Sequence, residues 1–258
     1  MRVHLLGSGG ALTTARRGNT SLAVEGGGRA VLVDCSGAPI QAMHRAGLEW
    51  TWLIDVIVTH RHADHIYGLP SLAHQLYVTS LELGRRHELR VHGPSDAMVA
   101  AELLLDSFGL TDREGFEVSF ETVPDEVHEL TLGDLRVTTF PVEHGKTAAI
   151  GVKLAPTTSR ERAVVYSGDT SLCDAVIDQC QGVPLVFHEC SSLSSAKLAG
   201  HTSLADIDEL AARTTAQRIV LVHLPPVSPQ EEGRVRRQLK SSFGGRVQLG
   251  EDGTSWEV

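Results

Sequence analysis

The sequence predicts an α/β protein whose β-sheets are covered by helices. Short runs rich in Val, Ile and Leu recur along the 258 residues, and Gly, Pro, Asp or Ser bounds most of them. Segments with apolar residues at helical spacing lie between many of these runs. Strands that alternate with helices are typical of α/β folds. No internal repeat, low-complexity tract or long linker interrupts the pattern, so the simplest interpretation is a single domain over residues 1–258.

The expected strands are short and apolar. The first ones are separated by short turns, which predicts antiparallel pairing, and "EGGGR" at 25–29 predicts a hairpin turn. The runs lie at 2–6, 20–24, 30–35, 54–60, 135–142, 149–154, 163–168, 184–189, 218–224 and 246–250.

The expected helices are amphipathic. The clearest covers 202–215, where Leu204, Ile207 and Leu210 repeat at helical period. Its start, Ser203 followed three residues later by Asp206, is close to a capping box. The other expected helices lie within 37–48, 68–83, 94–110 and 228–243.

Composition and charge exclude some classes of function. A formal net charge of -9 disfavours a broad phosphate-binding face for nucleic acid. The first residues lack the apolar stretch of a signal peptide, and no run approaches a membrane span. The cysteines show no C-x-x-C pairing, so we expect buried, reduced thiols in a cytoplasmic protein. They are Cys35, Cys173, Cys180 and Cys190.

The stretch "THRHADH", residues 59–65, is the strongest chemical signal. It places three histidines and one aspartate next to each other at the end of an expected strand. Imidazole suits zinc, and a carboxylate adds a harder oxygen ligand. Isolated histidines elsewhere, such as His44 or His128, are interpreted as surface or core residues without a metal. The seven-residue cluster therefore predicts a metal site.

"HRHADH" resembles the H-x-H-x-D-H signature of the metallo-β-lactamase-fold hydrolases. The other motif residues of that family occur in the expected order, each at the end of a strand-like run. They are Asp34 in "VLVDC", His144 in "FPVEHG", Asp169 in "YSGDT" and His223 in "LVHL". The resemblance covers roughly residues 3–252. It implies a four-layer αββα sandwich, in which Asp34 supports the metal loop without binding metal.

The resemblance also implies two divalent metal ions. The first would take His60, His62 and His144, the second Asp64, His65 and His223, and Asp169 would bridge them. His62 stands where a redox branch of the family carries an acid, which favours a hydrolytic, zinc-type site. Manganese or iron are the alternatives, because affinity order alone does not choose the metal.

Three residues are candidates for catalysis. Two metals provide a hydroxide nucleophile near neutral pH, and Asp64 would orient it. His201 in "GHTS", just before an expected helix, is the candidate general acid for the leaving group. Glu189 in "VFHEC" is its candidate partner. The alternatives are a capping or surface histidine and a carboxylate in an ordinary ion pair.

The succession "HEC", "GHTS" and "LVHL" resembles the ribonuclease Z branch of this family. That branch cleaves phosphodiesters, including small and cyclic ones, and contains some arylsulfatases. Members that process transfer RNA carry a long basic arm before the bridging aspartate. Here only residues 145–168 stand there, enough for two strands and a turn. The last histidine motif also differs from that branch, because it is "VHLPP" where the branch usually has T-H-F-S.

The expected function is therefore a two-metal phosphodiesterase acting on a small or cyclic phosphodiester. The alternatives are a ribonuclease Z-like endoribonuclease, a hydrolase of sulfate esters, lactones or carboxyl esters using the same site, and a metal-free relative with no activity. The basic residues in 159–166 and 231–240 are interpreted as solvated surface. No membrane partner is expected. A homodimer is compatible with the resemblance, since relatives often pair.

Overall fold

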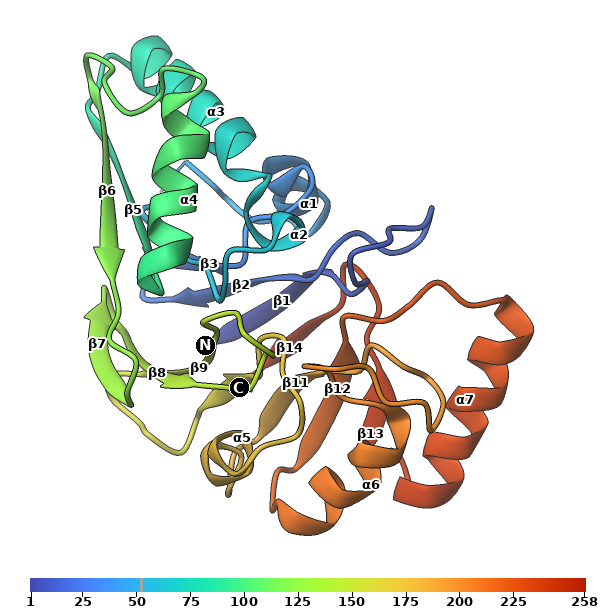
Figure 1. Cartoon of the computed structure of the whole chain (residues 1–258). Helices are drawn as coiled ribbons and strands as arrows, with labels where there is room; N and C mark the ends of the chain where they lie inside the picture. The colour runs from blue at the N-terminus through green and yellow to red at the C-terminus, as the bar shows by residue number, and fades with distance from the viewer. Residues whose placement is uncertain (52) are drawn as a thin grey trace.

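Two β-sheets lie face to face, and helices cover the outer side of each (Figure 1). The computed structural model describes residues 1–51 and 53–258. Within them each sheet has seven strands. In both sheets one part is antiparallel and the other parallel, and this division sets where the strand ends meet.

The first sheet comes mainly from the N-terminal half of the chain. Strands β14, β1, β2 and β3 pair antiparallel, and β3, β4, β5 and β6 pair parallel. The strands are β1 Arg2–Gly7, β2 Ser21–Gly26, β3 Arg29–Val33, β4 Asp55–Ile57, β5 His87–Gly93, β6 Phe116–Thr122 and β14 Ser255–Glu257; the helices in this half are α1 Pro39–Arg45, α2 Ala63–Ile66, α3 Leu69–Leu83 and α4 Ser95–Asp106.

The second sheet repeats this plan. Strands β7, β8, β9 and β10 pair antiparallel, and β10, β11, β12 and β13 pair parallel. The strands are β7 His128–Leu132, β8 Leu135–Pro141, β9 Ile150–Pro156, β10 Val164–Tyr166, β11 Leu185–Glu189, β12 Arg218–Val222 and β13 Val247–Leu249; the helices in this half are α5 Asp174–Gln179, α6 Leu204–Arg213 and α7 Pro229–Phe243.

Three apolar cores hold the four layers together. The central one lies between the sheets and includes Leu5, Tyr166 and Phe187, all fully buried. A second lies under α1, α3 and α4, and a third under α5, α6 and α7. The predicted αββα sandwich is therefore confirmed. In the part of the chain that the structure describes, every helix is too short or too polar to cross a bilayer.

The sequence predicted the central strands better than the outer ones. The runs expected as strands, the hairpin at 25–29 and the five helices are present. In α6 the backbone and hydroxyl of Ser203 both donate to the Asp206 carboxylate. Strands β5, β6, β7 and β14 and helices α2 and α5 were missed. Strands β6, β7 and β14 are sheet edges, so they bury fewer side chains and carry a weaker apolar signal.

The chain turns sharply where parallel strands end. Two non-glycine residues in the described ranges have positive φ, Asp34 at 59° and His223 at 54°. Asp34 follows β3 directly, and His223 follows β12. Such a conformation costs about 1–3 kcal/mol and persists where the surrounding structure imposes it. Both turns project side chains toward the space between the two sheets.

We expect Gly168→Ala to destabilise the fold strongly. Gly168 has φ +61°, and a Cβ there would lie 2.5 Å from the Ile150 carbonyl oxygen. The substitution combines left-handed strain with overpacking, so it should cost roughly 2–5 kcal/mol. The measurement is urea-induced unfolding of the metal-free protein.

Gly182→Ala is the matched control for this effect. Gly182 has φ +70°, but a Cβ there would meet nothing within 4 Å. It should lose only about 1 kcal/mol, which is the cost of the backbone strain alone. Equal losses for the two variants would contradict the role assigned to the close approach at Gly168.

Candidate metal centre

Side chains from both sheets converge where the parallel strands end. His60 follows β4, Asp169 follows β10 and His223 follows β12. Because the carboxyl ends of parallel strands share one edge of a sheet, residues far apart in sequence meet there. The two edges face each other between the sheets. The convergence therefore depends on the fold and not on the "HRHADH" segment alone.

Three histidines form one group at this edge. His62 Nδ1 lies 3.0 Å from His60 Nε2 and 3.1 Å from His144 Nε2. His60 and His144 are buried, whereas His62 is exposed. Three imidazole nitrogens that converge on one point are typical of a metal site.

Two carboxylates and two histidines form a second group beside the first. His223 Nε2 lies 3.3 Å from Asp64 Oδ2 and 3.2 Å from Asp169 Oδ2. His65 Nε2 lies 3.6 Å from the same oxygen of Asp64 and 3.5 Å from that of Asp169. Asp169 Oδ2 also lies 3.8 Å from His60 Nε2. Asp169 thus stands between the two groups.

The electrostatics of these buried groups favour a bound cation. Within the described residues, His65 Nε2 and Asp169 Oδ1 are buried without a hydrogen-bond partner. Burial, reinforced by the nearby His65, lowers the pKa of His60 well below its usual range. Burial alone would raise the pKa of Asp169, but His223 and His65 hold it well below its usual range. Burial alone would lower the pKa of His65 and His223, but the Asp169 carboxylate raises both. An acidic cluster that holds two histidines in this way, together with orphaned buried atoms, fits a divalent metal ion in place of the protons.

Further hydrogen bonds fix the orientation of the rings. Fully buried Asp34 accepts from the Thr59 backbone N–H at 2.8 Å and pairs with His65 Nδ1 at 2.7 Å. His144 Nδ1 lies 2.7 Å from the Gly200 carbonyl oxygen. In each case the outward nitrogen is held and Nε2 faces the cluster, as is usual for metal-ligating histidines. The supporting role that the resemblance implies for Asp34 agrees with these contacts.

His201 and Glu189 are in direct contact at the edge of the cluster. His201 Nδ1 lies 2.8 Å from Glu189 Oε1, and the His201 ring stacks on that of His223 with centroids 5.6 Å apart. Glu189 is fully buried, whereas the His201 side chain is 21% exposed. Burial alone would lower the pKa of His201, but the hydrogen bond and charge of Glu189 raise it. A histidine whose pKa is raised by a buried carboxylate is suited to donate a proton.

All nine residues named from the sequence as metal ligands or catalytic groups lie at this edge or in direct contact with it. The sequence interpretation missed some of the residues that hold them in place. Ser191 Oγ lies within hydrogen-bond distance of Glu189, His201 and His223. The signal was a hydroxyl residue two positions after Glu189 in the same stretch. The Tyr166 hydroxyl, which donates to Asp34 Oδ2 at 3.0 Å, left no signal because it appears as one more apolar strand residue.

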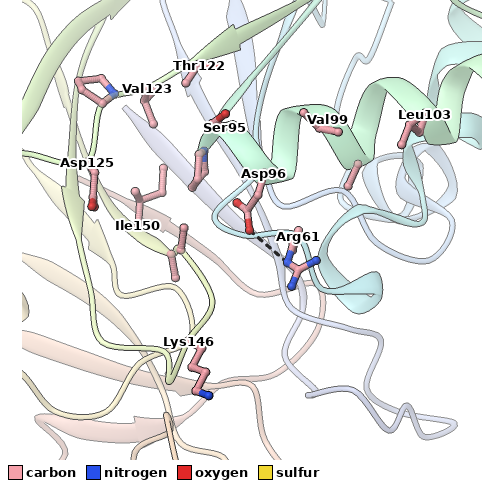
Figure 2. A pocket seen from close by; sticks show the side chains of 15 residues that line it. Arg61, Ser95, Asp96, Val99, Leu103, Thr122, Val123, Asp125, Lys146 and Ile150 are labelled. Atoms are coloured by element: carbon pink, nitrogen blue, oxygen red, sulfur yellow. Dashed lines mark ion pairs between the residues drawn. The ribbon is translucent and has the colours of Figure 1, made fainter.

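A groove of about 840 Å³ adjoins the metal loops (Figure 2). Arg61, which stands between His60 and His62, and Lys146, two residues after His144, both line it. Arg61 pairs with Asp96 at 3.1 Å. The remaining lining is largely apolar and includes Pro94, Val99, Leu103, Val123, Ala149 and Ile150. A concave, mainly apolar surface with a few polar groups is typical of a small-molecule site.

Known proteins share this fold and the whole length of the chain. Ribonuclease Z of Mycobacterium sp. (strain KMS) is 29% identical over 276 residues, which cover 98% of this chain and 94% of that protein. The metallo-β-lactamase fold protein YhfI from Bacillus subtilis superposes with a TM-score of 0.80 at 23% identity, covering 100% of this chain and 99% of that one. Human tRNase Z, short form, gives 0.78 at 19% identity, with coverage of 100% and 99%. A diphosphatase from the PhnP family gives 0.75 at 20% identity, with coverage of 100% and 97%.

Fold, cluster and relatives together define a metal-dependent hydrolase with the metallo-β-lactamase fold, similar to ribonuclease Z. Residues 1–243 match the family described as "Anti-Pycsar protein Apyc1", and the chain belongs to that family.

Proposed function

We propose that the chain is a phosphodiesterase that hydrolyses a small or cyclic phosphodiester with two divalent metal ions. The observation that carries the proposal is the His201–Glu189 pair, 2.8 Å apart, beside a cluster of histidines and carboxylates. This pairs a proton donor with a group of metal ligands in one cleft. Cleavage of an alkyl phosphodiester needs both, because the leaving alkoxide must be protonated while negative charge on the phosphoryl oxygens is neutralised.

The donor atoms of the cluster divide into two candidate sites. Zinc is the metal that their nitrogen and oxygen atoms fit best, and manganese or iron are the alternatives. A bound pair of ions supplies Lewis-acid activation of water and neutralises charge on the phosphoryl oxygens. We assign His60, His62 and His144 to one site, Asp64, His65 and His223 to the other, and Asp169 to both.

The chain's own residues then orient the reactants. The Asp64 carboxylate, 17% exposed, accepts a hydrogen bond from the attacking water. This contact directs a lone pair of the water oxygen at phosphorus. His201 donates its Nε2 proton to the oxygen of the departing alcohol, while Glu189 holds Nδ1 and stabilises the imidazolium. With a raised pKa, His201 remains a competent acid near neutral pH.

The groove in Figure 2 offers room for the organic part of the substrate. Its volume of about 840 Å³ lies within the range of ligand pockets. Arg61 and Lys146 lie beside the metal loops, and Asp96 and Asp125 also line the groove, with Asp96 paired to Arg61. We propose that one ester group of the phosphodiester lies against Val99 and Leu103 with its phosphate directed toward the cluster.

A ribonuclease Z-like endoribonuclease is the second candidate, favoured by the relative of that name. Strands β9 and β10 follow each other through a short connection, and no protruding arm stands between His144 and Asp169. Basic residues of this connection are held by the protein itself: Arg160 pairs with Glu129 at 3.5 Å, and Arg162 donates to the Val258 carbonyl oxygen at 2.9 Å. They favour a small substrate over RNA. A cytoplasmic location and a homodimer stay predictions.

The function is tested with a substrate panel on one preparation. Protein stripped with a chelator should cleave nothing, and protein reloaded with zinc or manganese should cleave bis(p-nitrophenyl) phosphate and at least one cyclic nucleotide. Precursor tRNA should be cleaved poorly, since the arm is missing. Metal-loaded protein that cleaves no phosphodiester but opens a lactone, a thioester or a sulfate ester would overturn the proposal. Efficient cleavage of precursor tRNA alone would favour the second candidate.

Loss of the general acid should depend on the leaving group. His201→Ala should slow cleavage of an alkyl phosphodiester by roughly 10²–10⁴-fold, because an alkoxide must be protonated as it departs. Cleavage that releases p-nitrophenolate should fall far less, because this anion departs without a proton. The measurement is kcat/KM for both substrates. His74→Ala, on the exposed face of α3, is the control. Equal losses for the two leaving groups would rule out the acid role.

The groove should select the ester that does not leave. Leu103, 66% exposed on α4, is replaced by Asp. KM for bis(p-nitrophenyl) phosphate should rise by about tenfold, the value of one buried Leu contact. KM for methyl p-nitrophenyl phosphate, which has the same leaving group, should stay unchanged. Leu83→Asp, 56% exposed at the end of α3 and outside the groove, is the matched control. Parallel changes for the two substrates would exclude the groove as a binding site.

A further inference from the structure

Ser191 occupies a position between the candidate general acid and a candidate metal ligand. Its hydroxyl oxygen lies 2.8 Å from His223 Nδ1, 2.9 Å from Glu189 Oε2 and 3.1 Å from His201 Nδ1. The residue follows β11 and is half-buried. Its backbone N–H also donates to Glu189 Oε2, at 2.9 Å.

The number of protons in this group leaves one consistent arrangement. A serine hydroxyl has one proton to donate, and an ionised carboxylate can only accept. The short contact with Glu189 therefore requires that Ser191 donates to Glu189. The contact with His223 then requires that His223 Nδ1–H donates to the Ser191 oxygen. If the hydroxyl turned toward His223, two unprotonated oxygens would face each other at 2.9 Å.

The same logic fixes the second imidazole. His201 Nδ1 lies 2.8 Å from Glu189 Oε1, so His201 donates to the carboxylate, and its contact with Ser191 at 3.1 Å is the weaker branch. Glu189 Oε1 also accepts from the Thr170 backbone N–H at 3.1 Å. The fully buried carboxylate thus orients both histidines: one directly and the other through Ser191.

We propose that Ser191 is a positioning residue that fixes the tautomer of His223 and connects it to the Glu189–His201 pair. Without metal, His223 Nε2 donates its proton to the carboxylates of Asp64 and Asp169, 3.3 and 3.2 Å away. Because Ser191 keeps the other proton on Nδ1, Nε2 is the nitrogen that would lose its proton and offer its lone pair when a metal ion binds. That is the form a metal ion needs from imidazole. The inference rests on the proposed function. It goes beyond that function because it places the general acid His201 and the metal ligand His223 in one hydrogen-bond network.

Substitution of Ser191 can remove the contacts of its hydroxyl and leave the backbone contact in place. Ser191→Ala keeps the backbone N–H that donates to Glu189 and deletes only the hydroxyl, which leaves His223 Nδ1–H buried without an acceptor. Ser191→Thr restores the hydroxyl. Ser192→Ala is the matched control: its hydroxyl lies 3.1 Å from that of Ser194 and contacts neither histidine.

The test compares these variants by zinc binding and by NMR. Competition with a chromophoric chelator should show that Ser191→Ala binds one zinc equivalent roughly 10–100-fold more weakly, the usual effect of removing a ligand's hydrogen-bond partner. In zinc-loaded ¹⁵N-labelled protein, the His223 Nδ1–H proton should be protected from solvent exchange in wild type and Ser191→Thr, and should exchange rapidly in Ser191→Ala. Ser192→Ala should match wild type. The zinc-free Ser191→Ala protein should still unfold in one cooperative step, with a midpoint lowered only as far as a single lost buried hydrogen bond requires. This shows that weaker zinc binding is a property of the folded variant.

The possible outcomes distinguish a failure of the inference on Ser191 from a failure of the proposed phosphodiesterase function. If wild type binds zinc and cleaves bis(p-nitrophenyl) phosphate while Ser191→Ala keeps wild-type affinity and a protected proton, the inference on Ser191 is wrong and the function stands. A variant Ser191→Thr that remains as impaired as Ser191→Ala would likewise overturn it. Wild type that takes up no zinc and cleaves no phosphodiester would instead contradict the proposed function.

Discussion

The fully buried Asp34 carboxylate connects the two sheets at the candidate metal centre. It accepts from the Thr59 backbone and from the Tyr166 hydroxyl, and it pairs with His65. Thr59 follows β4 of the first sheet, Tyr166 ends β10 of the second, and His65 lies on α2. A buried carboxylate is tolerated only when its lone pairs are satisfied. Correct placement of all three segments is therefore a condition for burying Asp34, and the same placement assembles the cluster.

This constraint explains why the structure accepts strain at the site. Asp34 and His223 both adopt positive φ without being glycine, and Gly168 takes the same region next to Asp169. Each turn directs a strand end into the gap between the sheets. The His223 backbone N–H donates to Thr20 Oγ1 at 3.0 Å, so the N-terminal segment fixes the last of these turns. The cost in stability is local, whereas the three cores under and between the sheets supply the compensating burial.

The sequence predicted the residues of the candidate site more completely than the residues that surround and support them. Histidines and carboxylates are sparse enough that "HRHADH" and the later strand-end stations stand out, and a metal needs those residue types at strand ends. His201 and Glu189 were also named, because an acid before a helix and a carboxylate at a strand end are recognisable. Ser191 could not be singled out, since serine is common and its importance lies in distances set by β11. The groove was invisible for a similar reason: its lining comes from several separate segments, each of ordinary composition. Edge strands such as β6 were missed because partial burial weakens the apolar pattern.

The most direct test of this account is a crystal structure of zinc-soaked protein with anomalous data collected on both sides of the zinc absorption edge. The account predicts two anomalous peaks: one among His60, His62 and His144 and the other among Asp64, His65 and His223, with the Asp169 carboxylate between them. A structure with no peak at this edge of the sheets, or with zinc bound only at other residues, would contradict the central claim that these side chains form a two-metal hydrolytic centre.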